Sequence, residues 1–196
     1  MKNILLGIAI ITITLASCSS NNNNSSENKN NGTQAILQSD NATLIKASDA
    51  KNTVLIKEIL SAYLQLKNAF TVDNATDAAN AGTALETAFK NFDKTALTVA
   101  QKKTFADVQD DAREHAEHIG KNGGNIAHQR EHFELLSKDV YELIKAFGGG
   151  QVLYKDFCPM YNNKKGAFWI SETKEIKNPY LGKSMLTCGT IKEVIK

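Results

Sequence analysis

Apolar residues recur at steps of three and four positions along four successive segments of the chain. This spacing is typical of amphipathic helices that bury one face. It predicts helices at about residues 48–70, 74–92, 98–119 and 125–147. Thr98 and Gln101 have the spacing of a capping box ahead of the third helix. The glycines at 120, 123 and 124 are expected to end it. Because the connections are short, we expect an up-and-down antiparallel four-helix bundle over residues 49–150.

The pattern changes after the three glycines at 148–150. Short runs rich in aromatic and β-branched residues at 151–157, 166–170 and 185–195 predict three strands, the last with Gly189 inside it. The fold class is therefore mainly α, with residues 151–196 forming a small irregular β appendage at the C-terminus. We expect this appendage to pack on the bundle, with Trp169 and Tyr180 between the two parts because of their size and position.

The first residues have the organisation of a signal peptide. Lys2 precedes an apolar run at 4–15, and small residues lead to Cys18. The apolar run is too short for a membrane-spanning helix, which needs about 20 residues. Residues 18–48 follow as a tether rich in Asn and Ser, which offers too little apolar surface to fold.

The tetrapeptide Leu15-Ala16-Ser17-Cys18 resembles the lipobox of bacterial lipoproteins. The resemblance implies that residues 1–17 are removed and that Cys18 carries the lipid that holds the protein to a membrane. No acidic residue adjoins Cys18, so we expect the outer membrane, with the domain facing the periplasm. The alternative is an ordinary secretory signal with a coincidental cysteine.

Four sulfur-containing side chains stand in two pairs within the C-terminal part: Cys158 with Met160, and Met185 with Cys188. Thiolate and thioether ligands suit Cu(I) and other soft ions. With Cys18 used for lipid, the same two cysteines would also suit a Cys158–Cys188 disulfide in an oxidising compartment. Core packing is the ordinary role of the methionines.

All four histidines fall in one stretch, His115 and His118 on the third helix and His128 and His132 on the fourth. Spacings of three and four residues place each pair on one side of its helix, and the short hairpin between the helices would bring the pairs together as auxiliary metal ligands. The alternative is a solvated surface, since the stretch is dense in charge. Gln129 falls within the apolar face of the fourth helix, where carbonyl groups of the C-terminal part could be its partners.

The formal net charge of +2, with both signs mixed along the chain, argues against nucleic acid as a partner. A glycine-rich phosphate loop, a nucleophile elbow and a paired-carboxylate arrangement are all missing from the sequence. We therefore expect a protein that is not an enzyme.

A further resemblance rests on motifs that follow one another in the chain: Gln129-Arg130-Glu131-His132-Phe133, Cys158-Pro159-Met160, Asn178-Pro179-Tyr180 and Met185-Leu186-Thr187-Cys188-Gly189. They resemble a domain-of-unknown-function family of exported Bacteroidetes proteins, over about residues 50–196. Members look like stand-alone lipoproteins or are fused to periplasmic adaptors of heavy-metal efflux pumps. The motif Cys158-Pro159-Met160 is also similar to the Cys-Pro-Met-His-Pro core of small metal-binding modules, but Tyr161-Asn162 stands where those modules have His-Pro.

These resemblances imply a cell-envelope lipoprotein that binds Cu(I) or another soft metal ion for sequestration or for delivery to heavy-metal efflux. The expected ligands are Cys158, Met160, Met185 and Cys188. The expected partners are the membrane and a periplasmic efflux adaptor. The alternative is a structural or interaction module fixed by the Cys158–Cys188 disulfide.

Overall fold

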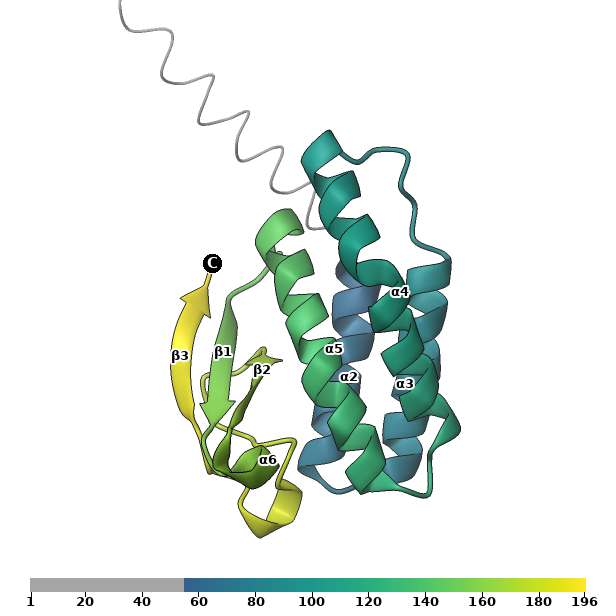
Figure 1. The fold of residues 1–196 in the computed structure, drawn as a ribbon. Coiled ribbons are helices and arrows are strands. Elements are labelled where there is room, and N and C mark those ends of the chain that lie inside the picture. The colour runs from purple at the N-terminus through teal and green to yellow at the C-terminus, as the bar shows by residue number, and fades with distance from the viewer. Residues whose placement is uncertain (1–54) are drawn as a thin grey trace, which may run out of the picture. The chain divides into compact units, whose positions relative to one another are not determined.

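The computed structural model describes residues 55–196 (Figure 1). The expected signal peptide, Cys18 and the whole tether at 18–48 lie outside the described residues. The elements are, in chain order, α2 (Lys57–Thr71), α3 (Ala75–Lys90), α4 (Val99–Lys121), α5 (Ile126–Phe147), β1 (Leu153–Cys158), α6 (Tyr161–Lys164), β2 (Ala167–Ser171), η1 (Gly182–Ser184) and β3 (Thr190–Ile195). The mainly helical fold with a small C-terminal sheet is confirmed.

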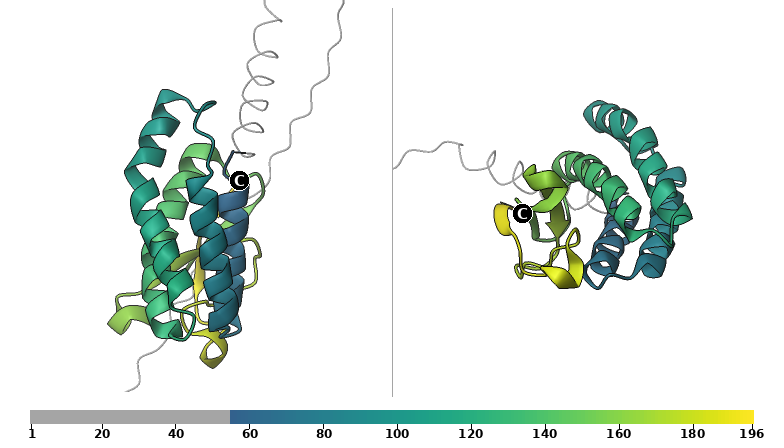
Figure 2. Two further views of the ribbon diagram at one scale, coloured as in Figure 1. Left: turned by 90° about the vertical axis from the view of Figure 1, so that its right-hand side faces the viewer. Right: turned by 60° about the horizontal axis from the view of Figure 1, so that its bottom comes forward.

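The four long helices lie side by side in chain order, and each short connection reverses the direction of the chain (Figures 1 and 2). Their apolar faces meet along the bundle axis, where Leu66, Leu85, Phe105 and Leu136 are almost completely buried. Among the described residues, the helices lack the combination of length and apolarity needed to cross a membrane.

Polar side chains cap the starts of α3, α4 and α5. The predicted capping box is present, with Thr98 and Gln101 each bonded to the other's backbone N–H. The third helix ends at Lys121, within the stretch 120–124 where its end is expected. Gly120 lies where α3 and α4 approach closely, since a Cβ on Gly82 would lie only 2.9 Å from the Gly120 nitrogen. At this position the glycine permits close packing and does not break the helix.

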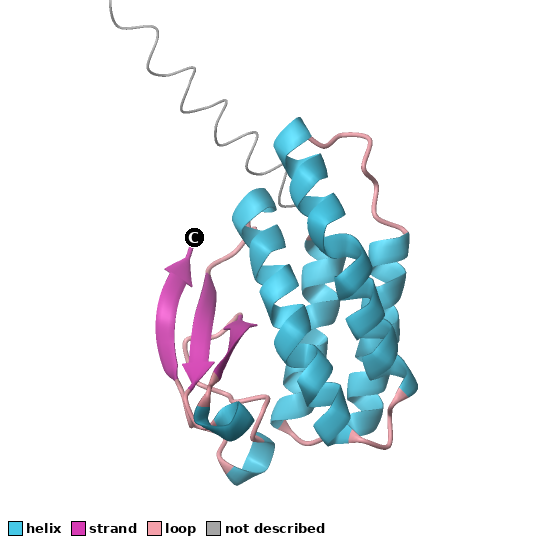
Figure 3. Ribbon diagram, in the orientation of Figure 1, coloured by secondary structure: helices cyan, strands magenta, loops and turns pink. Residues whose placement is uncertain are grey.

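The sheet has the strand order β2-β1-β3, and both pairings are antiparallel (Figure 3). The third strand is shorter than the predicted run of 185–195, because β3 begins only at Thr190, after Gly189. The hydrogen bonds of Asn178 explain why the third strand starts later than predicted. Its backbone N–H donates to the Leu186 carbonyl at 2.7 Å, and its side-chain amide donates to the Cys188 carbonyl at 2.6 Å. These carbonyls therefore face a loop and not a strand partner.

The sheet packs against α5 and α2, and the two parts share one core. The ring of Tyr180 lies 5.5 Å from that of Phe133 on α5, which confirms that Tyr180 packs between the two parts. Trp169 is completely buried, and its ring lies 6.0 Å from that of Tyr180. The hydroxyl of Tyr63 on α2 accepts a hydrogen bond from the Ile170 backbone at 3.1 Å and pairs with the Ser137 hydroxyl at 2.8 Å. One phenol thus links two helices to β2.

Two charged side chains are also buried between bundle and sheet. Lys67 on α2 donates to Glu172 at 2.7 Å, and burial lowers the pKa of its ammonium group. Asp156 faces Trp169 across the β1–β2 ladder, and neither of its carboxylate oxygens has a hydrogen-bond partner among the described residues. Burial raises the pKa of this carboxyl to about 6.

Candidate metal centre

The four histidines lie at the hairpin between α4 and α5. His115 and His118 occupy the last turns of α4, and His128 and His132 the first turns of α5. The hairpin is fixed by two asparagines: Asn122 donates to the His118 carbonyl at 2.8 Å, and the Asn125 side chain caps α5 by accepting from the His128 backbone at 3.2 Å.

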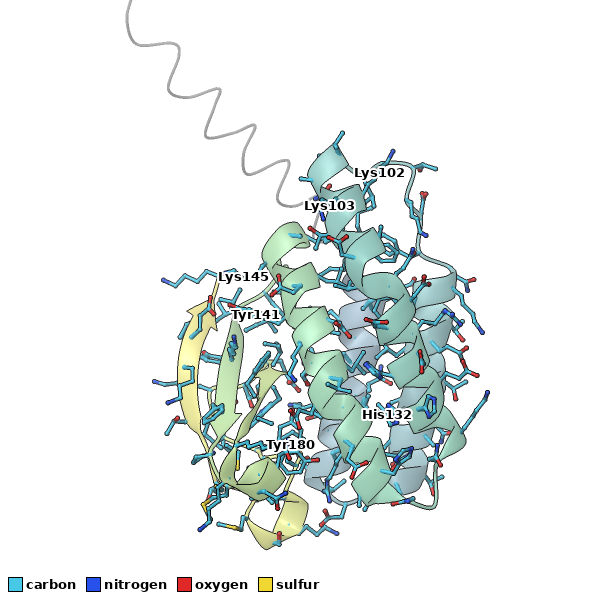
Figure 4. The ribbon with its side chains drawn as sticks, in the orientation of Figure 1. Lys102, Lys103, His132, Tyr141, Lys145 and Tyr180 are labelled. Carbon is cyan, nitrogen blue, oxygen red and sulfur yellow. The ribbon has the colours of Figure 1, made fainter. Side chains whose placement is uncertain are left out.

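The structure brings these side chains into one cluster, which we call the histidine cluster. One potential ligand atom from each of His118, His128 and His132 lies within 4.8 Å of the other two. His132 is the centre: its ring stacks on that of His118 at 4.4 Å and meets that of His128 edge-on at 4.6 Å. The Nδ1 of His132 also lies 3.2 Å from the Nδ1 of His115. Figure 4 shows His132 on the side of the bundle away from the sheet.

Two carboxylates adjoin the cluster and can fix the orientation of the rings. Glu131 lies 3.4 Å from the Nδ1 of His128, which leaves the Nε2 of that ring free for an ion. Glu114 lies 3.8 Å from the Nε2 of His118, which leaves the Nδ1 of that ring free. Carboxylates in this relation commonly set the tautomer of metal-binding histidines. The prediction from histidine spacing alone missed both residues, although Glu–His spacings of three and four positions are visible in the sequence.

The electrostatics of the cluster favour neutral rings at His132 and His115. Burial, and then the neighbouring His118, His115 and His128, lower the pKa of His132 to about 4. Burial likewise lowers the pKa of His115. A histidine with a lowered pKa is neutral at neutral pH, which is the form that binds a metal ion.

Three imidazoles at this separation can hold one transition-metal ion. Around a tetrahedral ion with metal–nitrogen bonds of 2.0–2.1 Å, ligand nitrogens lie about 3.4 Å apart. The rings would therefore turn inward by an ångström or so, which the exposure of His118 allows. Imidazole suits zinc, copper, iron and nickel.

The structure also brings the two cysteines of the appendage together. Their Sγ atoms lie 3.5 Å apart, and both residues are free thiols. Cys158, at the end of β1, is completely buried, whereas Cys188 is half-buried. Burial and the hydrogen bond with Cys158 raise the pKa of the Cys188 thiol. Met160 and Met185 lie on the adjoining turns with exposed side chains.

The expected partners of Gln129 are wrong. Its side-chain amide donates to the carbonyls of Ala75 and Ile119, at 3.0 Å each, and not to the C-terminal part. Both carbonyls belong to the bundle, one at the start of α3 and one near the end of α4. Gln129 on α5 thus links three helices through its side-chain amide.

No curated protein and no solved structure matches the chain. A family model does match residues 59–151, a segment that contains all four histidines and ends before Cys158. Over this segment the chain is similar to the family described as "Protein of unknown function (DUF3347)".

Proposed function

We propose that the protein binds a borderline transition-metal ion, Cu(II) or Zn(II), through the imidazoles of His118, His128 and His132. The observation that carries the proposal is the convergence of three ligand atoms, from two helices, within 4.8 Å. In a metal site of this kind, His115 would not bind the ion but would orient the ring of His132 through the contact between their Nδ1 atoms. Glu131 would orient the ring of His128 in the same way.

The composition of the cluster supports a ligand role over an ordinary solvated surface. The chain has only four histidines, and all of them lie in this one cluster. Crowded imidazoles repel one another as soon as they take up protons, which contributes to the low pKa of His132. A bound cation uses the same crowding favourably, because the neutral nitrogens then all donate electron pairs to one divalent ion.

The biological role that we propose is sequestration of the ion or its delivery to heavy-metal efflux in the cell envelope. This part rests on the lipobox at Cys18 and on the resemblance to proteins associated with efflux adaptors. In this proposal a lipid on Cys18 holds the domain at the outer membrane, where it faces the periplasm. Its partner is a periplasmic adaptor, and the domain has no catalytic activity.

The test is a calorimetric titration of the full-length protein in detergent with Zn(II) and with Cu(II). Both proteins compared carry Cys158→Ser and Cys188→Ser, so that sulfur cannot contribute. One of them also carries His118→Gln, His128→Gln and His132→Gln. We expect one ion to bind per chain in the first protein and none in the second. Equal binding by both would overturn the proposal, provided that circular dichroism shows the same helix content.

A further inference from the structure

The chain has a second group of potential metal ligands, which the histidine cluster does not include. Apart from Met1 and Cys18, every sulfur-containing residue belongs to the set Cys158, Met160, Met185 and Cys188. Figure 4 draws sulfur atoms at the end of the sheet beside α6, and the Sγ atoms of Cys158 and Cys188 lie 3.5 Å apart. We call this group the sulfur cluster.

We propose that the sulfur cluster is a separate site for one soft monovalent ion of the Cu(I) class, with the Cys158 and Cys188 thiolates as its principal ligands. The inference goes beyond the proposed function, because it uses another ligand set on another part of the fold. Each thiol releases its proton to solvent as its sulfur binds the ion, and no electron is transferred.

The first support is the separation of the two thiols. With ion–sulfur bonds of about 2.3 Å, as for zinc, two thiolates lie about 3.8 Å apart when the two thioethers complete a tetrahedral shell, so the observed 3.5 Å needs only a small opening. A disulfide requires about 2.05 Å, so the same sulfur atoms would have to close by about 1.5 Å. The observed spacing is therefore nearer to that of a shared ion.

The second support is that the backbone holds both cysteines in place. Cys158 is paired with Ala167 in the β1–β2 ladder. The Cys188 N–H donates to the Met185 carbonyl at 3.0 Å, and its carbonyl accepts from the buried Asn178 at 2.6 Å. A pair of ligands that is fixed before the ion arrives loses little conformational entropy on binding.

The third support is the position and exposure of the thioethers. Met160 is two residues after Cys158, and Met185 is three residues before Cys188, at the other end of one turn. Their side chains are 48% and 45% exposed, although methionine is an apolar residue. Thioether sulfur prefers soft ions, and exposed side chains can swing over an ion held by the thiolates.

The experiment is a competition between the full-length protein, reduced and free of oxygen, and a chromogenic Cu(I) chelator. We expect the protein to withdraw one ion per chain from the chelator. The ion should be lost in the variant with Cys158→Ser and Cys188→Ser and retained in the variant with His118→Gln, His128→Gln and His132→Gln. Met160→Leu with Met185→Leu should raise the dissociation constant without abolishing binding.

Three outcomes of this competition would overturn the proposal of a Cu(I) site at the sulfur cluster. One is a protein whose two free thiols are verified with a thiol reagent and which still fails to compete. Another is a Cys158–Cys188 disulfide that resists reduction, which would make the pair a structural link. A third is loss of the ion in the histidine variant alone, which would assign Cu(I) to the histidine cluster. Failure here would leave the Zn(II) and Cu(II) titration of the histidine cluster unaffected.

Discussion

The Nδ1 atoms of His115 and His132 lie 3.2 Å apart, although the two side chains come from different helices. At this distance one ring must donate a proton and the other must accept it, so both rings cannot be charged together. The contact occupies the Nδ1 of His132 and leaves its Nε2 available as a ligand atom. It therefore orients the central ring of the cluster before an ion binds.

Replacement of Glu131 with Gln tests the orientation of the cluster. Glu131 lies 3.4 Å from the Nδ1 of His128, and loss of such a carboxylate typically weakens metal binding by about 10–100-fold. We expect a weakening of that size for Zn(II), measured by competition with a chelator. Glu142→Gln, an exposed change farther along α5, is the matched control and should leave affinity unchanged. Equal affinity in all three proteins would show that Glu131 has no orienting role.

Replacement of Tyr63 with Phe tests the link between bundle and sheet. It removes the acceptor of the Ile170 N–H and the partner of the Ser137 hydroxyl, both in the buried interior. We expect the free energy of unfolding to fall by about 1–3 kcal/mol, as for other buried polar groups left without a partner. Denaturation in urea measures it. Tyr154→Phe, at a half-buried tyrosine on β1, is the control and should change stability by less than about 0.5 kcal/mol.

The raised pKa of Asp156 should make the stability of the protein depend on pH. Its folded-state pKa of about 6 is above its ordinary value of 3.8, so the folded protein binds this proton more tightly than the unfolded chain. The contribution of protonated Asp156 to the free energy of unfolding is fully present below about pH 3.8 and is lost as the pH rises through about 6. The full effect is at most about 3 kcal/mol.

The Asp156→Asn variant isolates this contribution, because other groups also titrate in the window and His132 acts with the opposite sign. We expect the difference in unfolding free energy between variant and parent to shift in the variant's favour from pH 4 to pH 7. A difference that stays constant across this range would mean that Asp156 does not titrate there.

Cys18→Ser tests the membrane anchor. If Cys18 carries lipid, the parent protein sediments with membranes and incorporates labelled fatty acid, whereas the variant does neither. Fractionation of cells that express each form gives the result. Lipid incorporation that persists in the variant would remove Cys18 from the proposal.

The bundle could be predicted from the sequence because its helices are long and each has a regular apolar face, and because a capping box marks the start of α4 at Thr98. The sheet was less predictable. The start of β3 depends on Asn178, which captures two carbonyls across a loop, and such distant hydrogen bonds leave no local pattern. The end of the third helix within 120–124 could be predicted from its glycines. The close contact of Gly120 with α3 could not, because a glycine at a helix end and one at a close helix contact look alike in sequence.

The candidate site was predictable in part. Spacing placed the histidines on facing sides of a hairpin, but their convergence on His132 depends on the packing of α4 against α5. The approach of Cys158 and Cys188 to 3.5 Å depends on the ladder and the Asn178 loop, and no sequence rule gives that distance. Asp156 was missed because one acidic residue in a short strand looks like a solvated position.

X-ray absorption spectroscopy of the full-length protein loaded with one Zn(II) per chain tests most directly whether the histidine cluster holds the ion. We predict a first shell of nitrogen at about 2.0–2.1 Å, with the outer-shell scattering of imidazole from three histidines. A first shell dominated by sulfur at about 2.3 Å, or by oxygen without imidazole scattering, would contradict it.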